Sequence, residues 1–262
     1  MALFDHTAER LATGPTLALA AERADEVTRL LHRYDPAVQA RGDHFAFGNG
    51  VVLHGPTPVT AKLAAKAGLP EETVTAYRAS ILPPAKRHHR PEDRTRRDAQ
   101  RLIRGLAVRL GGTVHGSRPS QVINLRAAVY APRPVPPAEV ISVLQPYASG
   151  TLFAEDNPDV AESYSLLTRE SPRFWVIYWP PRMAENPMEP PAAGIGTLRD
   201  QQPCRWELSN RHPADKASAD LCLDVGRAAF DLARHTSGAV TDSYGFPIDK
   251  PEDLLPGSHI TR

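Results

Sequence analysis

The chain has 262 residues, 41% of them hydrophobic and 23% charged, which are the proportions of an ordinary globular protein. Because no run approaches about 18 consecutive apolar residues, we expect no membrane helix and no membrane partner. Its two cysteines, Cys204 and Cys222, exclude a disulfide framework and a cysteine metal site. The first residues lack the basic segment of a signal peptide, so we expect a cytoplasmic location.

Charge is distributed unevenly along the chain, although the formal net charge is only +1. Residues 1–131 carry 19 basic and 12 acidic side chains, and the remainder carries 12 basic and 18 acidic ones. Such asymmetry is typical of a protein that binds an acidic partner such as nucleic acid. It is equally typical of a protein whose own charged surfaces pair with each other.

The beginning of the chain has helix and hairpin signals. Residues 16–34 carry apolar side chains at helical spacing, and Asp35-Pro36 ends the predicted helix, since the residue before proline avoids the helical region. Two β-rich runs, 44–47 and 51–54, flank Gly48-Asn49-Gly50 and predict a hairpin.

Residues 57–79 predict two helices separated by a Gly-Leu-Pro turn. Small, turn and apolar residues occupy the positions that a helix-turn-helix requires: Ala64, Gly68, Leu69 and Val74. The segment therefore resembles a helix-turn-helix, and the resemblance implies a second helix that enters the major groove of DNA. Glu71 and Glu72 at the start of that helix would repel phosphates. An ordinary pair of antiparallel helices explains the same pattern.

The helix predicted from Thr95 to Leu110 follows a basic, proline-rich linker at 83–98. Its apolar residues form one stripe of a 3.6-residue period: Ala99, Leu102, Ile103, Leu106, Ala107 and Leu110. Gly111-Gly112 ends the helix, as glycine does just past the last apolar turn.

The second half of the chain predicts strands at 121–130, 163–167, 174–179 and 205–209, with helices at 137–144 and 217–235. The strand 174–179 is apolar on both faces, which indicates a central, covered strand. Trp175 and Trp179 lie four residues apart in it and share one face, where core or interface packing is the expected role. The tail 242–248 is expected to dock Tyr244, Phe246 and Ile248.

An internal echo links the two long helices. Leu106-Ala107, Gly112, Val114 and Ser117 recur at identical spacing as Leu232-Ala233, Gly238, Val240 and Ser243. Both copies predict a helix, a glycine stop and a short strand. A true duplication and a coincidence of small residues are both open at this point.

These elements predict an α+β fold: a two-layer sandwich with a mainly antiparallel sheet covered by two long helices, preceded by a small helical and hairpin region. The expected domains are residues 1–82, the linker 83–98, a sandwich domain at 99–250 and a tail at 251–262.

Basic residues around the first long helix are candidates for binding a partner or nucleic acid: Lys86, Arg87, Arg94, Arg97, Arg101 and Arg104. Such a stripe is typical of a phosphate-contacting face. Alternatively, the arginines pair internally with an acidic stripe on the second long helix, namely Asp220, Asp224 and Asp231. The aromatic residues Trp175 and Trp179 are further binding candidates.

Catalytic and metal-binding motifs are absent from the sequence. His88, His89, Glu92 and Asp93 are metal-ligand types, but they lie in a polar linker, where solvated side chains are expected. No nucleophile motif, phosphate loop or zinc signature occurs. We therefore expect no metal, no cofactor and no catalytic residue.

The function expected from these features is a non-catalytic, cytoplasmic binding or inhibitor protein of the immunity type, with a protein as its partner. The first alternative is a DNA-binding protein that uses residues 57–79 and the basic run 86–109. The second is an enzyme with a dispersed site.

Overall fold

The computed structural model describes residues 2–82, 92–116, 124–157, 162–168, 174–181, 195–196, 198, 201, 203–214 and 216–259. The chain divides into two compact units. The first unit comprises Met1–Gln121 with Pro256–Arg262, and the second comprises Val122–Leu255. None of the helices in the described ranges combines the length and the apolar character needed to cross a bilayer.

The first unit is built on a six-stranded antiparallel sheet in the order β2-β3-β4-β5-β1-β6. Its elements in chain order are α1 (Ala2–Thr13), β1 (Thr16–Leu19), α2 (Ala24–Tyr34), β2 (Gln39–Arg41), β3 (His44–Ala46), β4 (Val51–Pro58), α3 (Ala61–Ala67), β5 (Thr75–Ile81), α4 (Glu92–Leu110) and β6 (Thr113–His115).

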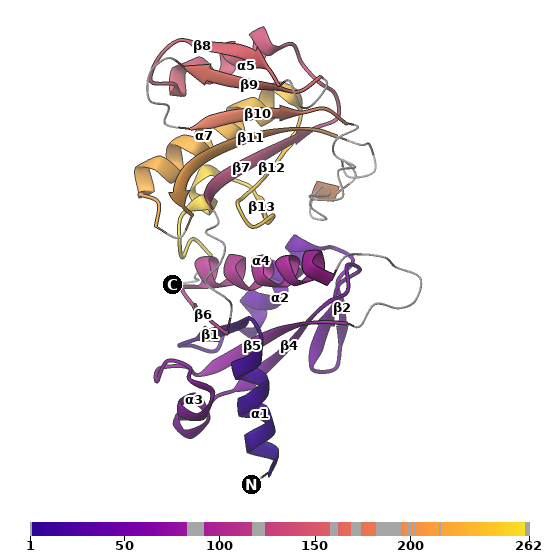
Figure 1. Ribbon diagram of the computed structural model, residues 1–262, viewed down its shortest axis with the longest axis vertical. Helices are drawn as coiled ribbons and strands as arrows, with labels where there is room; N and C mark the ends of the chain where they lie inside the picture. Colours follow the sequence, from indigo (N-terminus) through magenta and orange to yellow (C-terminus); the bar gives the residue numbers. More distant parts are fainter. Residues whose placement is uncertain are drawn as a thin grey trace. The chain divides into compact units, whose positions relative to one another are not determined.

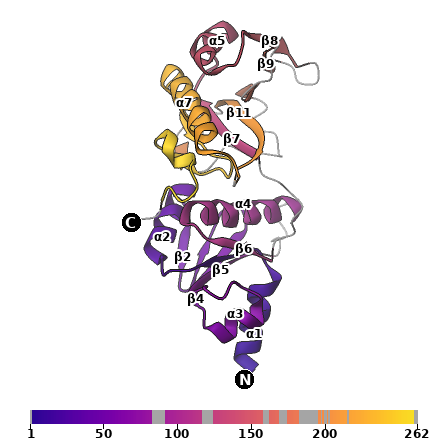
Figure 2. The ribbon, with the colours of Figure 1, turned by 90° about the vertical axis from the view of Figure 1, so that its left-hand side faces the viewer.

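Helices cover both faces of this first sheet. Figures 1 and 2 show α2 and α4 on one side, and α1 and α3 on the other. The apolar stripe predicted for α4 is buried along its whole length. On the opposite face, Ala18 and Ala76 are cross-strand partners beneath α1 and α3 and share a small core with Leu11 and Leu63.

The second unit is built on a seven-stranded antiparallel sheet in the order β13-β12-β7-β11-β10-β9-β8. Its elements are β7 (Asn124–Ala131), α5 (Pro137–Leu144), η1 (Gln145–Tyr147), β8 (Leu152–Asp156), β9 (Tyr164–Thr168), β10 (Trp175–Trp179), β11 (Cys204–Pro213), α7 (Ala219–Thr236), β12 (Ala239–Thr241), β13 (Pro247–Ile248) and η3 (Pro251–Leu254).

The helices α5 and α7 cover the same face of this sheet, as Figure 2 shows. Trp206 lies at the centre of that core and is fully buried. Its indole nitrogen donates to the Tyr164 hydroxyl at 3.0 Å. The Tyr164 ring stacks on Tyr178 at 4.8 Å between centroids. The hydrogen bond to Tyr164 therefore satisfies the buried indole N–H of Trp206, as burial requires.

The two units share one topology. In each, the chain runs strand, helix, four strands, long helix, strand. The sheet order places the last of these strands beside the first. Thus β1, β5, α4 and β6 of the first unit correspond to β7, β11, α7 and β12 of the second. The first unit adds α1 and α3, and the second adds β13.

The repeated sequence marks equivalent positions of this topology. Gly112 donates its backbone N–H to Ala107 at 2.9 Å, and Gly238 donates to Ala233 at 2.8 Å, so both helices end in the same cap. A Cβ on Gly238 would lie 2.5 Å from the Tyr130 carbonyl oxygen, and one on Gly112 would lie 2.9 Å from the Ala18 carbonyl oxygen. Glycine is therefore required at both positions by the adjacent strand.

The predicted fold class is wrong. The structure contains two large antiparallel sheets of six and seven strands and six α-helices in its described part, instead of one sheet covered by two long helices. The helix predicted from residue 95 caused part of the error, because it was assigned to the C-terminal sandwich. It packs instead on β1, β4 and β5 of the first unit, within which the predicted linker 83–98 also falls.

The helix-turn-helix resemblance is also wrong as a structure, because Thr75–Ile81 forms strand β5. Gly68 adopts a left-handed conformation with φ 67° and caps α3. Ala64 and Leu69 are buried beside α1 as predicted packing positions, but Val74 is 46% exposed.

Similarly, Thr16–Leu19 forms the fully buried strand β1 and does not extend the following helix. A short apolar run fits both the 3.6-residue period of a helix and the 2-residue period of a strand, and pairing in the sheet decides which of the two forms.

The other predicted elements are confirmed to within four residues at each end. They are the hairpin of β3 and β4, the helices α4, α5 and α7, and the strands β7, β9, β10 and β11. β10 is central, between β9 and β11. Tyr244, Phe246 and Ile248 of the tail are buried.

Because the repeat places the two long helices at equivalent positions, we expect each to be equally important for the stability of its own unit. Leu106→Ala and Leu232→Ala each delete a fully buried side chain and should cost about 2–5 kcal/mol. Hydrogen exchange read by mass spectrometry should show faster exchange in α4, β1 and β5 for the first variant. For the second, exchange should rise in α7, β7 and β11.

Leu82→Ala is the matched control, because Leu82 is 55% exposed and its loss should leave exchange unchanged. If Leu106→Ala perturbed the second unit as strongly as the first, the division into two units would be contradicted.

Candidate functional site

The helices α5 and α7 lie on one face of the second sheet, and we call the opposite face the open face. Strand register determines its members. Trp175, Ile177 and Trp179 of β10 stand opposite Ser209, Glu207 and Arg205 of β11. Those β11 residues in turn stand opposite Arg126, Ala128 and Tyr130 of β7. The alternate residues of these strands form the core with α5 and α7.

Arginine and tryptophan side chains stack on this face. The Arg211 guanidinium carbon lies 4.9 Å from the centroid of Trp175, and that of Arg205 lies 5.7 Å from the centroid of Trp179. Both distances are within the range of cation–π attraction. Both indoles are half-buried, and Arg211 is exposed. The two pairs hold four long side chains in defined positions.

A carboxylate anchors the centre of the open face. Glu207 accepts from Arg205 at 2.8 Å and from Arg126 at 3.3 Å. The side chains of Glu207 and Arg205 are each only 11% exposed, and that of Arg126 is 20% exposed. Ion pairs with little exposure to water are weakly screened, so this pairing fixes the arginines on the sheet.

The tail of the second unit fixes the start of β7, from which Arg126 projects. The Ser243 hydroxyl accepts from the Arg126 backbone N–H at 2.7 Å and donates to the Arg126 carbonyl at 3.1 Å. Asp242 accepts from the N–H groups of Tyr244 and Phe246 at 2.9 and 2.8 Å. This turn holds the tail against the sheet.

Part of the open face is covered by the connection between β10 and β11. Ile195 and Leu198 pack on Ala128, Tyr130 and Ala239, which lie on β7 and β12. At the other edge, Phe153 of β8 is 41% exposed. On β10 and β11 of this face, Trp175, Trp179 and Arg205 are half-buried and Arg211 is exposed.

The structure brings some predicted binding residues together and separates others. Trp175 and Trp179 share one face of β10, as their spacing predicts, and lie beside Arg205 and Arg211. Sequence reasoning did not select these arginines. The alternating run 205–209 was a signal for their face, but the register with β10 is tertiary information.

The basic candidates of the first half belong to the first unit. Arg94 is buried, and Arg97, Arg101 and Arg104 are half-buried on α4. Lys86 and Arg87, like His88 and His89, lie outside the described residues. Binding of a partner or an anion by this stripe stays a prediction.

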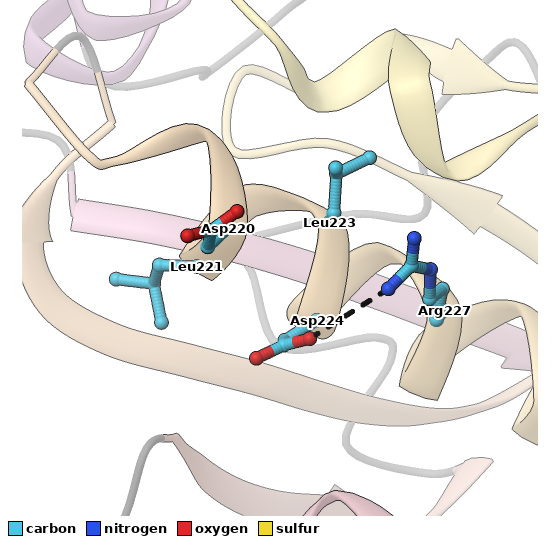
Figure 3. Close-up of a pocket in the computed structure, with 5 residues that line it drawn as sticks. All are labelled: Asp220, Leu221, Leu223, Asp224 and Arg227. Atoms are coloured by element: carbon cyan, nitrogen blue, oxygen red, sulfur yellow. Dashed lines mark ion pairs between the residues drawn. The ribbon is translucent and has the colours of Figure 1, made fainter.

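Acidic residues of α7 have basic partners on the same helix. Asp224 pairs with Arg227 at 4.0 Å (Figure 3). Asp231 pairs with Arg234 and accepts from the Tyr147 hydroxyl. Burial and this hydrogen bond raise the pKa of Tyr147 to about 12.

A shallow open hollow lies beside Asp220, Leu221 and Leu223 on the surface of α7. Because its lining comes from the outside of one helix, it does not gather groups for catalysis.

The two cysteines of the second unit are buried. Burial raises the pKa of the Cys204 thiol to about 12 and also raises that of Cys222. Within the described ranges, no three His, Cys, Asp or Glu side chains converge as a metal site would require.

Comparison with known proteins gives no family for this chain. No protein-family model, curated protein or solved structure matches it.

Removal of the central carboxylate should destabilise the second unit. Glu207→Ala leaves two largely buried arginines without this carboxylate, which should cost about 3–5 kcal/mol. Glu207→Gln should cost less, since the amide oxygen still accepts hydrogen bonds. All three tryptophans lie in the second unit, so denaturant unfolding followed by tryptophan fluorescence reports on it. Glu252→Ala, at an exposed position of the same unit, is the control; equal midpoints for both alanine variants would contradict the anchoring role.

Both cysteine thiols should be unreactive in the folded protein. A raised pKa keeps a thiol protonated, and the thiolate is the reactive species. At about pH 8, a disulfide reagent should label neither Cys204 nor Cys222 in the native state, and should label both in denaturant. Rapid labelling of one native thiol would show that its burial is wrong.

Proposed function

We propose that this protein is a non-catalytic binding protein that takes a protein partner on the open face of its second sheet. The observation that carries the proposal is the pair of tryptophans on the open face, each stacked by an arginine. Tryptophan and arginine dominate the binding energy of protein interfaces, and a few such residues carry most of it.

Preorganisation supports this role. The aromatic side chains project from a central strand, and Glu207 holds two of the arginines in place. Side chains that are ordered before binding lose less conformational entropy in the complex. An inhibitor of the immunity type, which must hold its target tightly, would benefit from such a rigid face.

Charge indicates the kind of partner. Arg126, Arg205 and Arg211 outnumber Glu207 on β7, β10 and β11 of the open face. A complementary protein surface presents carboxylates around an apolar patch that covers Trp175 and Ile177.

A nucleic acid fits this face less well than a protein. Bases stack on free aromatic faces, but arginines already stack on both indoles. The Glu207 carboxylate at the centre would repel phosphates. The first alternative of the sequence analysis placed DNA elsewhere, on a helix pair of which the second helix is strand β5.

The test maps binding onto the face directly. A photo-crosslinking amino acid at Ile177 should capture a host protein, and the same group at Leu223 on α7 should not. Affinity for the captured protein is then measured with purified components. Trp175→Ala and Arg211→Glu should each weaken it by at least tenfold, because truncated hot-spot residues typically cost about 2 kcal/mol or more.

Arg227→Glu is the matched control for Arg211→Glu, since both arginines are exposed but Arg227 lies on α7. Equal losses in the two charge variants would contradict the proposal. Binding of single-stranded DNA that weakens with salt and with Trp175→Ala would replace the protein partner by a nucleic acid.

A further inference from the structure

Basic side chains stand opposite one another across four strands of the first sheet. Arg41 of β2 is the cross-strand partner of His44, His44 is the partner of His54, and His54 is the partner of Arg78 on β5. Directly opposed residues project from the same face of a sheet. The four side chains therefore form a basic row that crosses the strands.

A fifth basic group reaches this row from α1. Arg78 lies two residues after Ala76, which packs beneath α1 and α3, so the row and these helices share a face. The Arg78 guanidinium also lies next to Gly14, just past the end of α1. Arg10, in the last turn of α1, is close enough for its charge to lower the pKa of both Arg78 and His54.

Few acidic groups compensate these charges. Asp43 contacts His44 at 3.2 Å and is exposed in the hairpin turn. His54 has Arg10, Arg78 and His44 as basic neighbours, with Asp43 as the opposing charge. Burial, followed by the charges of the two arginines, lowers the pKa of the His54 imidazole. Like charges placed directly opposite one another destabilise a sheet, so a bound anion would stabilise this one.

Hydrogen-bond donors converge at the β4–β5 part of the row. The His54 Nε2 atom and the Ser80 hydroxyl are 2.8 Å apart. The Nε atom of Arg78 is buried and has no hydrogen-bond partner among the described residues. A buried donor without a partner is costly, and an oxyanion is the kind of ligand that would satisfy it.

We propose that Arg10, Arg78, His54 and Ser80 form a binding site for a phosphate group. These side chains come from three elements, α1, β4 and β5, and supply guanidinium, imidazole and hydroxyl donors. A tetrahedral phosphate offers oxygens in several directions to such donors, and charge-assisted bonds to it are strong. His44 and Arg41 extend the row toward β2, where a second anionic group of a larger ligand would lie.

The hydrogen bond between His54 and Ser80 does not make a hydrolytic triad. In that arrangement a carboxylate orients the histidine, whereas Asp43 contacts His44. Among the described residues, no carboxylate is hydrogen-bonded to the ring of His54. In the proposed site, Ser80 accepts from the protonated imidazole of His54 and donates its hydroxyl proton to the phosphate.

The primary experiment follows the pKa of His54 in the full chain by NMR, with and without inorganic phosphate. A bound anion favours the imidazolium form, so phosphate should raise the pKa of His54, and its affinity should increase as the pH falls from about 7.5 to 6. The charged groups that face His54 are Arg10 on α1, Arg78 on β5, and His44 and Asp43 of the hairpin. An unchanged pKa in saturating phosphate would overturn the site.

Variants then locate the site by calorimetry. Arg78→Gln should weaken phosphate binding at least tenfold, and Arg78→Lys should weaken it less, because the charge remains. Arg29→Gln is the control, at an exposed arginine of α2 on the other side of the sheet. Equal affinities for Arg78→Gln and Arg29→Gln would contradict the proposal.

A comparison of ligands shows whether the bound phosphate group belongs to an ester or to the free ion. Tighter binding of phosphoserine or a nucleoside monophosphate than of inorganic phosphate indicates a phosphate ester, and the reverse order indicates the free ion. Citrate binding as tightly as all of these would overturn the assignment to phosphate. The site lies in the first unit and uses no residue of the open face, so its failure leaves the proposed function untouched.

Discussion

The close approach of a helix end to a strand is the constraint on which both units depend. Each long helix stops at a left-handed residue, Gly111 or Ser237, and the following glycine lies against the carbonyl of the first strand. A side chain at Gly112 or Gly238 would occupy the space of that carbonyl. This contact brings the last strand of the topology beside its first strand and thereby holds the helix across the sheet.

In each unit the two helices of the shared topology lie on one side of the sheet, and the other side differs between the units. In the second unit the open face carries tryptophans, arginines and one buried carboxylate, and Ile195 and Leu198 pack on part of it. In the first unit α1 and α3 cover only the end of the sheet near Ala18. Beside them lies the basic row. One topology therefore presents an aromatic surface in one unit and a basic surface in the other.

The sequence predicted correctly those elements whose pattern depends only on residues close together in the chain. The stripe of α4, the proline that begins α5 and the turn of the hairpin all depend on residues within a few positions of each other. It failed at Thr16–Leu19 and Thr75–Ile81, where the local pattern also fits a helix. Those runs become strands because β1 lies between β5 and β6 and is buried on both faces. Strand pairing also brings Trp179 of β10 to Arg205 of β11, and His54 of β4 to Arg78 of β5.

The sequence by itself determined the long helices, most strands, the shared face of Trp175 and Trp179, and the echo between the two helix ends. These features depend on spacing along the chain, which a period of 2 or 3.6 residues encodes directly. Only the tertiary structure decided that α4 belongs to the first sheet, and that the echo marks two copies of one topology. It alone placed arginines on the tryptophans and aligned the basic row, because register between strands joins residues far apart in sequence.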